Sequence, residues 1–326
     1  MSTRSDTREC AKCAGEGSLR CAGCMDSPDY HAGDSVDVAY CGKDCQKDHW
    51  STHKAQCIGM QRRKKLLRAA ILLKTVFLTY RDCFFDVDLT KIEFRDGILY
   101  LHQKLHHATS RGYRGPFPAH ITTDNEHKEA ALANNQCTAS MAILSRLTWK
   151  ALAGLTSTVE LMDIRIGKPL VPTRLTPLEG LPGDAPHTVL KVRQLRSNED
   201  WILDPAGCQY GFRVALAPFQ KYLDDHKCQI ISPPTHYDWT ETEDLDYYSS
   251  ILPYTSAQRR DHEVDRMARL HHAAFVDECF GNGNSMIRRL LNGTMTQFQD
   301  ELDDVVRRLR EHMKEFVETK LPRLKA

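Results

Sequence analysis

Eight cysteine and histidine residues near the start of the chain have the spacing of metal ligands. They occur as four short pairs: Cys10-x2-Cys13, Cys21-x2-Cys24, Cys41-x3-Cys45 and His53-x3-Cys57. Two thiolates on one CxxC turn can reach the same ion, and ligands four positions apart lie one helical turn apart. Eight ligands are enough for two tetrahedral Zn(II) ions. Because this segment has few large apolar residues, we expect both zinc ions to be structural and to supply its folding energy.

The stretch YCGKDCQKDHWSTHKAQC (40–57) resembles the second half of a MYND zinc finger. The match to the MYND pattern includes the non-ligand residues Tyr40, Gln46, Trp50 and Lys54. The resemblance implies interleaved ligands: Cys10, Cys13, Cys41 and Cys45 for one zinc, and Cys21, Cys24, His53 and Cys57 for the other. It also implies a protein-interaction module that docks short proline-containing peptides.

Two further features of this region have simple structural explanations. The middle segment 25–39 is longer than the MYND pattern, so we interpret it as a surface loop and His31 within it as a solvated residue rather than a ligand. The basic run RRKK (62–65) could contact phosphate. We interpret it instead as the solvated first turn of a following helix.

Farther along the chain, Cys137, His187 and Asp204 have the order and context of a thiol-based catalytic triad. Apolar residues at helical spacing predict a helix over 134–155 that has Cys137 in its first turn, and alternating residues predict strands at 157–167, 187–195 and 200–207. A helix N-terminus lowers the pKa of a thiol. A histidine on one strand can then act as general base, and an acid on the next can fix its tautomer.

Residues 125–215 resemble the transglutaminase-like branch of the papain-type fold. In that branch the histidine strand is followed by Trp-x-x-[apolar]-Asp-Pro, here Trp201 to Pro205. The flank NNQCTAS lacks the Cys-Gly or Cys-Trp context of those families, so the oxyanion donors we consider are the Cys137 N–H with Gln136 or Asn135. The alternative is that Cys137 is a small buried apolar residue and Asp204 ends a strand at a turn. Cys208 is a weaker candidate nucleophile because no helix terminus activates it.

The predicted fold is α+β, with three parts. They are a two-zinc MYND finger (1–60), a papain- or transglutaminase-like body of helices and antiparallel sheet (61–250), and a C-terminal helical segment (251–326). The remaining expected elements are a helix at 61–82, a hairpin at 91–103 around Asp96-Gly97, and helices at 214–226, 256–280 and 295–319. We expect the last helix to dock on the body, and a dimer helix is the alternative.

Composition narrows the function classes. Forty-four basic residues nearly cancel 43 acidic ones, so net charge gives no indication of nucleic-acid binding. The most apolar run, 66–80, is short and interrupted by charges, and no signal peptide is visible, so we expect no membrane contact. Seven of twelve cysteines lie within 10–57 and the rest are scattered, which favours a reducing compartment, the cytoplasm or nucleus.

Three functions fit a MYND finger joined to such a body. The first is a thiol acyl-transfer enzyme: a peptidase, a deamidase, a transglutaminase-like enzyme or an acyltransferase. Its acyl donor could be a peptide, a glutamine side chain, a thioester or an aminoacyl ester. The second is a non-catalytic adaptor whose body is a scaffold for protein partners. We do not expect the third, a SET-type methyltransferase, because there the finger is inserted within the SET fold, whereas here nine residues precede it.

Overall fold

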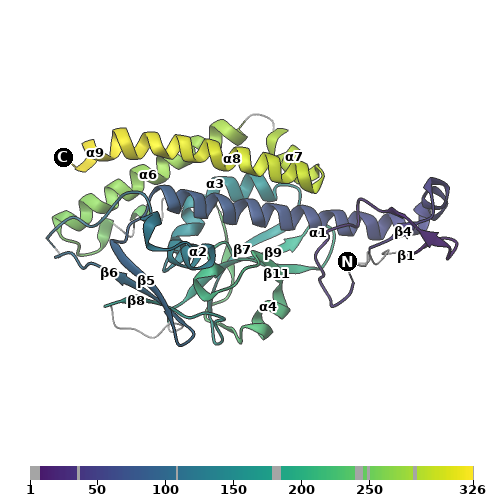
Figure 1. The fold of residues 1–326 in the computed structure, drawn as a ribbon, viewed down its shortest axis with the longest axis horizontal. Coiled ribbons are helices and arrows are strands. Elements are labelled where there is room, and N and C mark those ends of the chain that lie inside the picture. The colour runs from purple at the N-terminus through teal and green to yellow at the C-terminus, as the bar shows by residue number, and fades with distance from the viewer. Residues whose placement is uncertain are drawn as a thin grey trace.

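The computed structural model describes residues 8–34, 37–107, 109–177, 185–238, 245–247, 250–281 and 285–325. A small N-terminal unit is joined by one long helix to a body in which sheet lies below and helices lie above (Figure 1). The α+β class predicted from the sequence is confirmed. The papain-like identity of the body stays a prediction.

Helix α1 (Lys43–Cys83) connects the N-terminal unit to the body (Figure 1). Its first half holds His53 and Cys57, and its second half buries apolar side chains such as Phe77 in the core. The sequence predicts this helix only from residue 61. The predicted boundary between the finger and the body therefore lies inside one continuous helix.

The central sheet is antiparallel and has the order β11-β10-β9-β7-β12, with β13 also paired to β7. Its strands are β7 (Thr156–Arg165), β9 (His187–Gln194), β10 (Asp200–Leu203), β11 (Leu216–Pro218), β12 (Gln229–Ile230) and β13 (Thr235–His236). Strand β9 lies between β10 and β7 and is buried along most of its length. The three strands predicted from alternation are thus present as β7, β9 and β10.

A second sheet consists of β5 (Leu89–Arg95), β6 (Ile98–Gln103) and β8 (Thr173–Thr176), with β8 parallel to β6. The predicted hairpin is confirmed: β5 and β6 are antiparallel, and both Asp96 and Gly97 between them have positive φ. Two residues with positive φ are what a type I′ turn requires. Short pairs β1 (Arg8–Glu9) with β2 (Glu16–Gly17), and β3 (Leu19–Arg20) with β4 (Ala39–Tyr40), shape the N-terminal unit.

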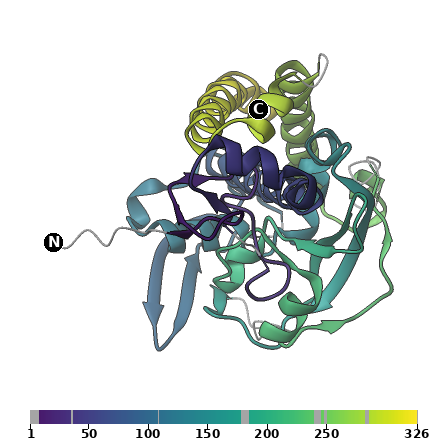
Figure 2. The ribbon, with the colours of Figure 1, turned by 90° about the vertical axis from the view of Figure 1, so that its right-hand side faces the viewer.

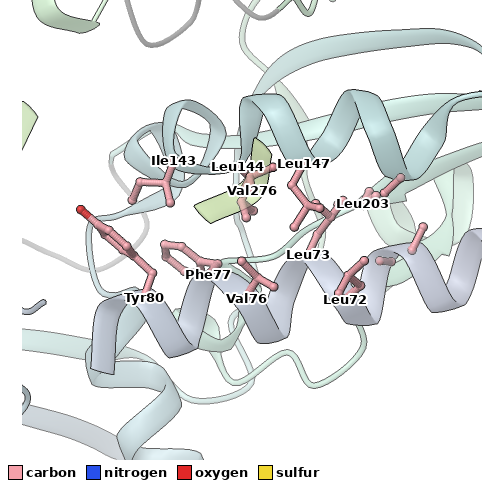
Figure 3. Packing of buried hydrophobic residues seen from close by; sticks show 14 of the residues in the cluster. Leu72, Leu73, Val76, Phe77, Tyr80, Ile143, Leu144, Leu147, Leu203 and Val276 are labelled. Atoms are coloured by element: carbon pink, nitrogen blue, oxygen red, sulfur yellow. The ribbon is translucent and has the colours of Figure 1, made fainter. Parts of the chain in front are cut away.

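Helix α3 (Cys137–Leu152) packs against α1 and against β9 of the central sheet. Figure 3 shows Phe77 of α1 and Leu147 of α3 in the same apolar layer, with Leu203 of β10 beside them. This packing fixes the first residue of α3 relative to β9 and β10. Short helices complete the body: η1 (Ala119–Ile121), α2 (Asn125–Ala133), η2 (Gly207–Tyr210) and α4 (Phe219–Asp225).

The C-terminal helices form a layer over α1 and α3, on the side away from the central sheet (Figure 2). They are α6 (Ser256–Phe280), α7 (Ser285–Asn292), α8 (Met295–Glu315), the π-helical turn η3 (Phe316–Lys320) and α9 (Leu321–Lys325). The apolar side of α8, including Leu309, is buried within the chain, so the predicted docking on the body is confirmed. Among the described helices, none has an apolar stretch long enough to cross a bilayer.

Candidate functional site

The first metal cluster joins Cys10, Cys13, Cys41 and Cys45, whose sulfur atoms all lie within 4.8 Å of one another. Cys10 and Cys13 lie on the turn after β1, and Cys41 and Cys45 lie where β4 passes into α1. The Cys13 and Cys41 sulfurs are 3.7 Å apart. Tetrahedral Zn–S bonds of about 2.3 Å place two sulfurs about 3.8 Å apart, so the donor set fits zinc.

The second cluster joins Cys21, Cys24, His53 and Cys57, and all four side chains are buried. The Cys21 and Cys57 sulfurs are 3.7 Å apart, and Nε2 of His53 lies 3.3 Å from the Cys24 sulfur. Three thiolates and one imidazole nitrogen at these separations again fit a tetrahedral zinc ion. The interleaved ligand sets implied by the MYND resemblance are confirmed.

The segment 25–39 is not simply a surface loop. Tyr30 packs its ring on Trp201 of β10 with centroids 5.2 Å apart, and its hydroxyl accepts a hydrogen bond from the Asp200 N–H. Asp34 accepts two hydrogen bonds from Arg63, which also pairs with Glu199 of the body. The expectation missed this docking because it depends on residues about 170 positions away.

The structure gives different outcomes for the two remaining expectations in this region, those for His31 and for the basic run 62–65. His31 is exposed, and neither cluster found among the described residues includes it. The expectation that the basic run 62–65 is a solvated first helical turn is wrong, because the run lies within α1 and Arg63 is buried between two carboxylates. Lys64 donates to the Ala22 carbonyl.

The three candidate catalytic residues come from three adjacent elements. Cys137 is the first residue of α3, His187 is the first residue of β9, and Asp204 directly follows β10, the antiparallel neighbour of β9. Nε2 of His187 lies 3.0 Å from Oδ2 of Asp204, and both side chains are almost fully buried. The Cys137 sulfur lies 3.8 Å from the Pro186 carbonyl oxygen, just before His187, and Cys137 and His187 are close enough to shift each other's pKa. Because Nε2 faces Asp204, the ring nitrogen left for the thiol is Nδ1.

Buried hydrogen bonds hold the Asp204 carboxylate in its ionised form. The Tyr222 hydroxyl donates to Oδ2 at 2.7 Å, and the Ala206 N–H donates to Oδ1 at 3.2 Å. Burial alone would raise the pKa of Asp204, but the charge of His187 and these bonds lower it. A fixed negative charge is therefore in contact with the imidazole.

The same arrangement changes the proton affinity of the other two groups. Burial alone would lower the pKa of His187, but the Asp204 carboxylate and the Cys137 thiol raise it to about 10. Burial alone would raise the pKa of Cys137, but the interaction with His187 lowers it. The N–H groups of Thr138 and Thr188 also lower it. These directions make the thiol a better proton donor and the imidazole a better proton acceptor than burial alone would.

The three candidate oxyanion donors, Gln136, Asn135 and the Cys137 N–H, differ in the hydrogen bonds that they already make. The side-chain amide of Gln136 donates to Asp86 at 3.3 Å, so this amide is already engaged. Asn135 is exposed and has φ of 56°, and its backbone N–H donates to Oε1 of Gln209. Gln136 is the N-cap of α3. The first N–H groups of a helix have no intrahelical partner, so the Cys137 N–H is in position to serve as a donor.

Sequence reasoning missed three residues that contact this cluster. Gln209 lies 3.3 Å from Nδ1 of His187, Tyr210 packs edge-on against the imidazole, and Tyr222 binds Asp204. The only signal for Gln209 and Tyr210 in the sequence is proximity to the Asp-Pro turn, because η2 immediately follows it, whereas Tyr222 lies farther along the chain in α4 and has no such signal. The competing thiol, Cys208, donates to the Glu129 carbonyl, and burial raises its pKa to about 12.

Comparison with known families identifies the N-terminal segment. Residues 10–57 match the family model of the MYND finger, and both metal clusters lie within these residues. This segment is therefore a MYND zinc finger with two structural zinc sites. A search of curated proteins and of solved structures gives no match for the chain.

Proposed function

We propose that the protein is a thiol acyl-transfer enzyme in which Cys137 is the nucleophile, His187 the general base and Asp204 the residue that orients His187. The observation that carries this proposal is the buried pair of His187 with Asp204 at 3.0 Å, next to the Cys137 thiol at the start of α3, which lies 3.8 Å from the Pro186 carbonyl oxygen. A nucleophile, a base and an orienting acid brought together in one place are the minimum set for this chemistry.

The geometry supports a two-step reaction. In the first step the thiol proton moves to Nδ1 of His187 while the sulfur bonds to a carbonyl carbon. The tetrahedral intermediate then breaks its bond to the leaving group, which takes the proton from His187 and leaves a thioester on Cys137. In the second step His187 removes a proton from an acceptor, water or an amine. The acceptor displaces the sulfur, which is reprotonated. Peptide, glutamine, thioester and aminoacyl ester substrates all suit these steps.

Differential thiol labelling tests the proposal. We expect iodoacetamide to modify Cys137 near neutral pH faster than Cys279, which is equally exposed at 8% but whose pKa is raised by burial. Tryptic mass spectrometry measures both rates in one sample. His187→Ala should slow the labelling of Cys137 to the rate of Cys279 and leave Cys279 unchanged. Labelling of Cys137 at or below the rate of Cys279 in the unmodified protein would reject the catalytic assignment.

The second candidate is a non-catalytic adaptor. The observation that favours it is the low exposure of Cys137, since only 8% of this residue is accessible. The labelling experiment separates the two functions, because a scaffold gives the thiol no reason to be reactive.

In both cases we propose that the MYND finger recruits protein partners, in particular proline-containing peptides. The half-exposed Trp50 ring, which lies edge-on to the zinc ligand His53, offers an aromatic contact for them. We also propose that the protein works in the cytoplasm or nucleus. None of the twelve cysteines, all of which lie among the described residues, is in a disulfide: seven are zinc ligands, and a reducing compartment preserves the other five as thiols.

A further inference from the structure

Gln209 is a buried glutamine whose amide joins three segments of the candidate site. Oε1 accepts a hydrogen bond from the Asn135 N–H at 3.2 Å, two residues before Cys137. Nε2 donates to the Ala206 carbonyl at 3.2 Å, and it lies 3.3 Å from Nδ1 of His187. Only 4% of the residue is exposed, so water does not compete for these partners.

The two backbone partners fix which way the amide points. A backbone N–H can only donate and a backbone carbonyl can only accept, so Oε1 must face Asn135 and Nε2 must face Ala206. Rotation of the amide by 180° would place two donors together at Asn135 and two acceptors together at Ala206. Because Nε2 carries only donors, Gln209 can offer His187 nothing but an N–H.

This orientation selects one protonation state of the imidazole. To accept from Gln209, Nδ1 must be without a proton, and the ring proton must then be on Nε2, where Asp204 accepts it at 3.0 Å. An imidazolium would instead turn an Nδ1–H toward the Gln209 N–H. Asp204 therefore favours the protonated ring, and Gln209 opposes it.

We propose that Gln209 is a positioning residue that holds His187 as the neutral Nε2–H tautomer, so that Cys137 keeps its proton until it attacks a substrate. The inference rests on the proposed acyl-transfer function. During attack Nδ1 gains the thiol proton and loses the Gln209 hydrogen bond. The imidazolium is then destabilised, which favours donation of that proton to the leaving group. The bond to Asn135 also ties the amide to the turn that precedes the nucleophile.

The other ionisable groups around His187 do not produce this effect. Cys137 faces it from α3, Asp204 from the end of β10, and Tyr210 from η2, and Tyr222 of α4 lies behind Asp204. Burial raises the pKa of both tyrosines, so each stays neutral through the physiological range.

Two substitutions separate the donor role of Gln209 from its structural role. Gln209→Glu keeps an oxygen for the Asn135 N–H but replaces the N–H that faces His187 with a second oxygen, which accepts from an imidazolium. Gln209→Met fills a similar volume and removes all three contacts. Gln194→Met is the matched control, because Gln194 is a buried glutamine at the far end of the same strand as His187.

The measurement is the rate of Cys137 alkylation by iodoacetamide between pH 5 and 9, on the full zinc-loaded chain without substrate. We expect the profile of Gln209→Glu to move to lower pH and that of Gln209→Met to move less in the same direction. A profile displaced by one pH unit corresponds to an about tenfold faster reaction at pH values below the inflection. Gln194→Met should leave the profile unchanged.

Two results would overturn the inference: superimposable profiles for the unmodified protein and Gln209→Glu, or a displacement of the Gln209→Glu profile to higher pH. If Gln209→Glu lowers the melting temperature but leaves the alkylation profile unchanged, the inference is also overturned, because Gln209 then has a purely structural role. The failure of the proposed function is read separately, from the labelling of the unmodified protein alone.

Discussion

His187 and His272 are both fully buried, yet their surroundings give the two imidazoles opposite affinities for a proton. His187 contacts the Asp204 carboxylate, which outweighs burial and raises its pKa to about 10. His272 lies in α6 with its ring edge-on to Tyr80, in the apolar layer between helices. Burial, with a smaller contribution from the neighbouring His312, lowers its pKa to about 3. A neighbouring carboxylate therefore decides whether a buried histidine has a high or a low affinity for a proton.

His272 should make the fold sensitive to acid. In the unfolded chain this histidine takes a proton below pH 6.5, whereas in the folded chain it does so only near pH 3. The unfolded state thus binds more protons between these values, so the free energy of unfolding falls as the pH falls, by up to about 1.4 kcal/mol per pH unit. His272→Leu should weaken this dependence. Urea denaturation of both proteins at pH 7.5, 6 and 5 measures it, and comparing them cancels the effect of acid on the zinc sites. Parallel curves would refute the assignment.

At the scale of elements, helix α1 shows most clearly what local sequence could and could not predict. Its second half has apolar residues at helical spacing, and the prediction found it. Its first half is charged and holds the ligands His53 and Cys57, so no apolar stripe marks it as helical. The helix predicted from 214 begins only at Phe219, because Leu216–Pro218 pair with β10. Pairing with a distant strand decides that boundary.

The residues of the candidate site also fall into two groups, those that the local sequence pattern predicts and those that it does not. Cys137, His187 and Asp204 were predictable because each lies at the end of an element whose pattern is local. Gln209 and Tyr222 were not, because their importance arises only when η2 packs against α2 and α4 packs against β10. The hairpin around Asp96 and the bounds of α6 were predictable because turn residues and a Thr255 capping box mark them locally.

The contact between finger and body depends on Arg63 of α1, and we expect Arg63→Met to be strongly destabilising. The substitution leaves Asp34 and Glu199 without their shared cation, and both carboxylates are mostly buried. Removing one partner of a buried ion pair costs about 3–5 kcal/mol, and the partial exposure here lowers the expected loss to about 2 kcal/mol. Chemical denaturation of the zinc-loaded protein measures it. Combining Arg63→Met with Asp34→Asn and Glu199→Gln should recover part of the loss. A change below about 0.5 kcal/mol would show that the contact is dispensable.

For the molecule as a whole, the two zinc sites differ in how closely they are linked to the rest of the chain. The cluster of Cys21, Cys24, His53 and Cys57 is buried, and α1 continues from it into the core. Gln61, one turn farther along α1, donates to the Cys57 sulfur. In the other cluster Cys13 and Cys41 are exposed. Loss of the buried zinc should therefore disturb more of the molecule.

Single-ligand substitutions test this difference. We expect both Cys57→Ser and Cys13→Ser to reduce the zinc content from two ions per chain to one, as measured by plasma mass spectrometry. Cys57→Ser should lower the melting temperature more, because it frees buried groups at the start of α1. Equal melting temperatures in the two variants would contradict a closer link of the buried site to the fold.

The uninterrupted course of α1 also gives the molecule a fixed reach. A helix of 41 residues extends about 60 Å at about 1.5 Å per residue. The contacts of Arg63 and Tyr30 prevent its first half from swinging as a tethered domain would. If the finger binds a peptide and Cys137 is the nucleophile, as proposed above, the bound peptide would be held at one distance and one angle from Cys137. Partners would then be selected by the length of the segment between their docking motif and their reactive group.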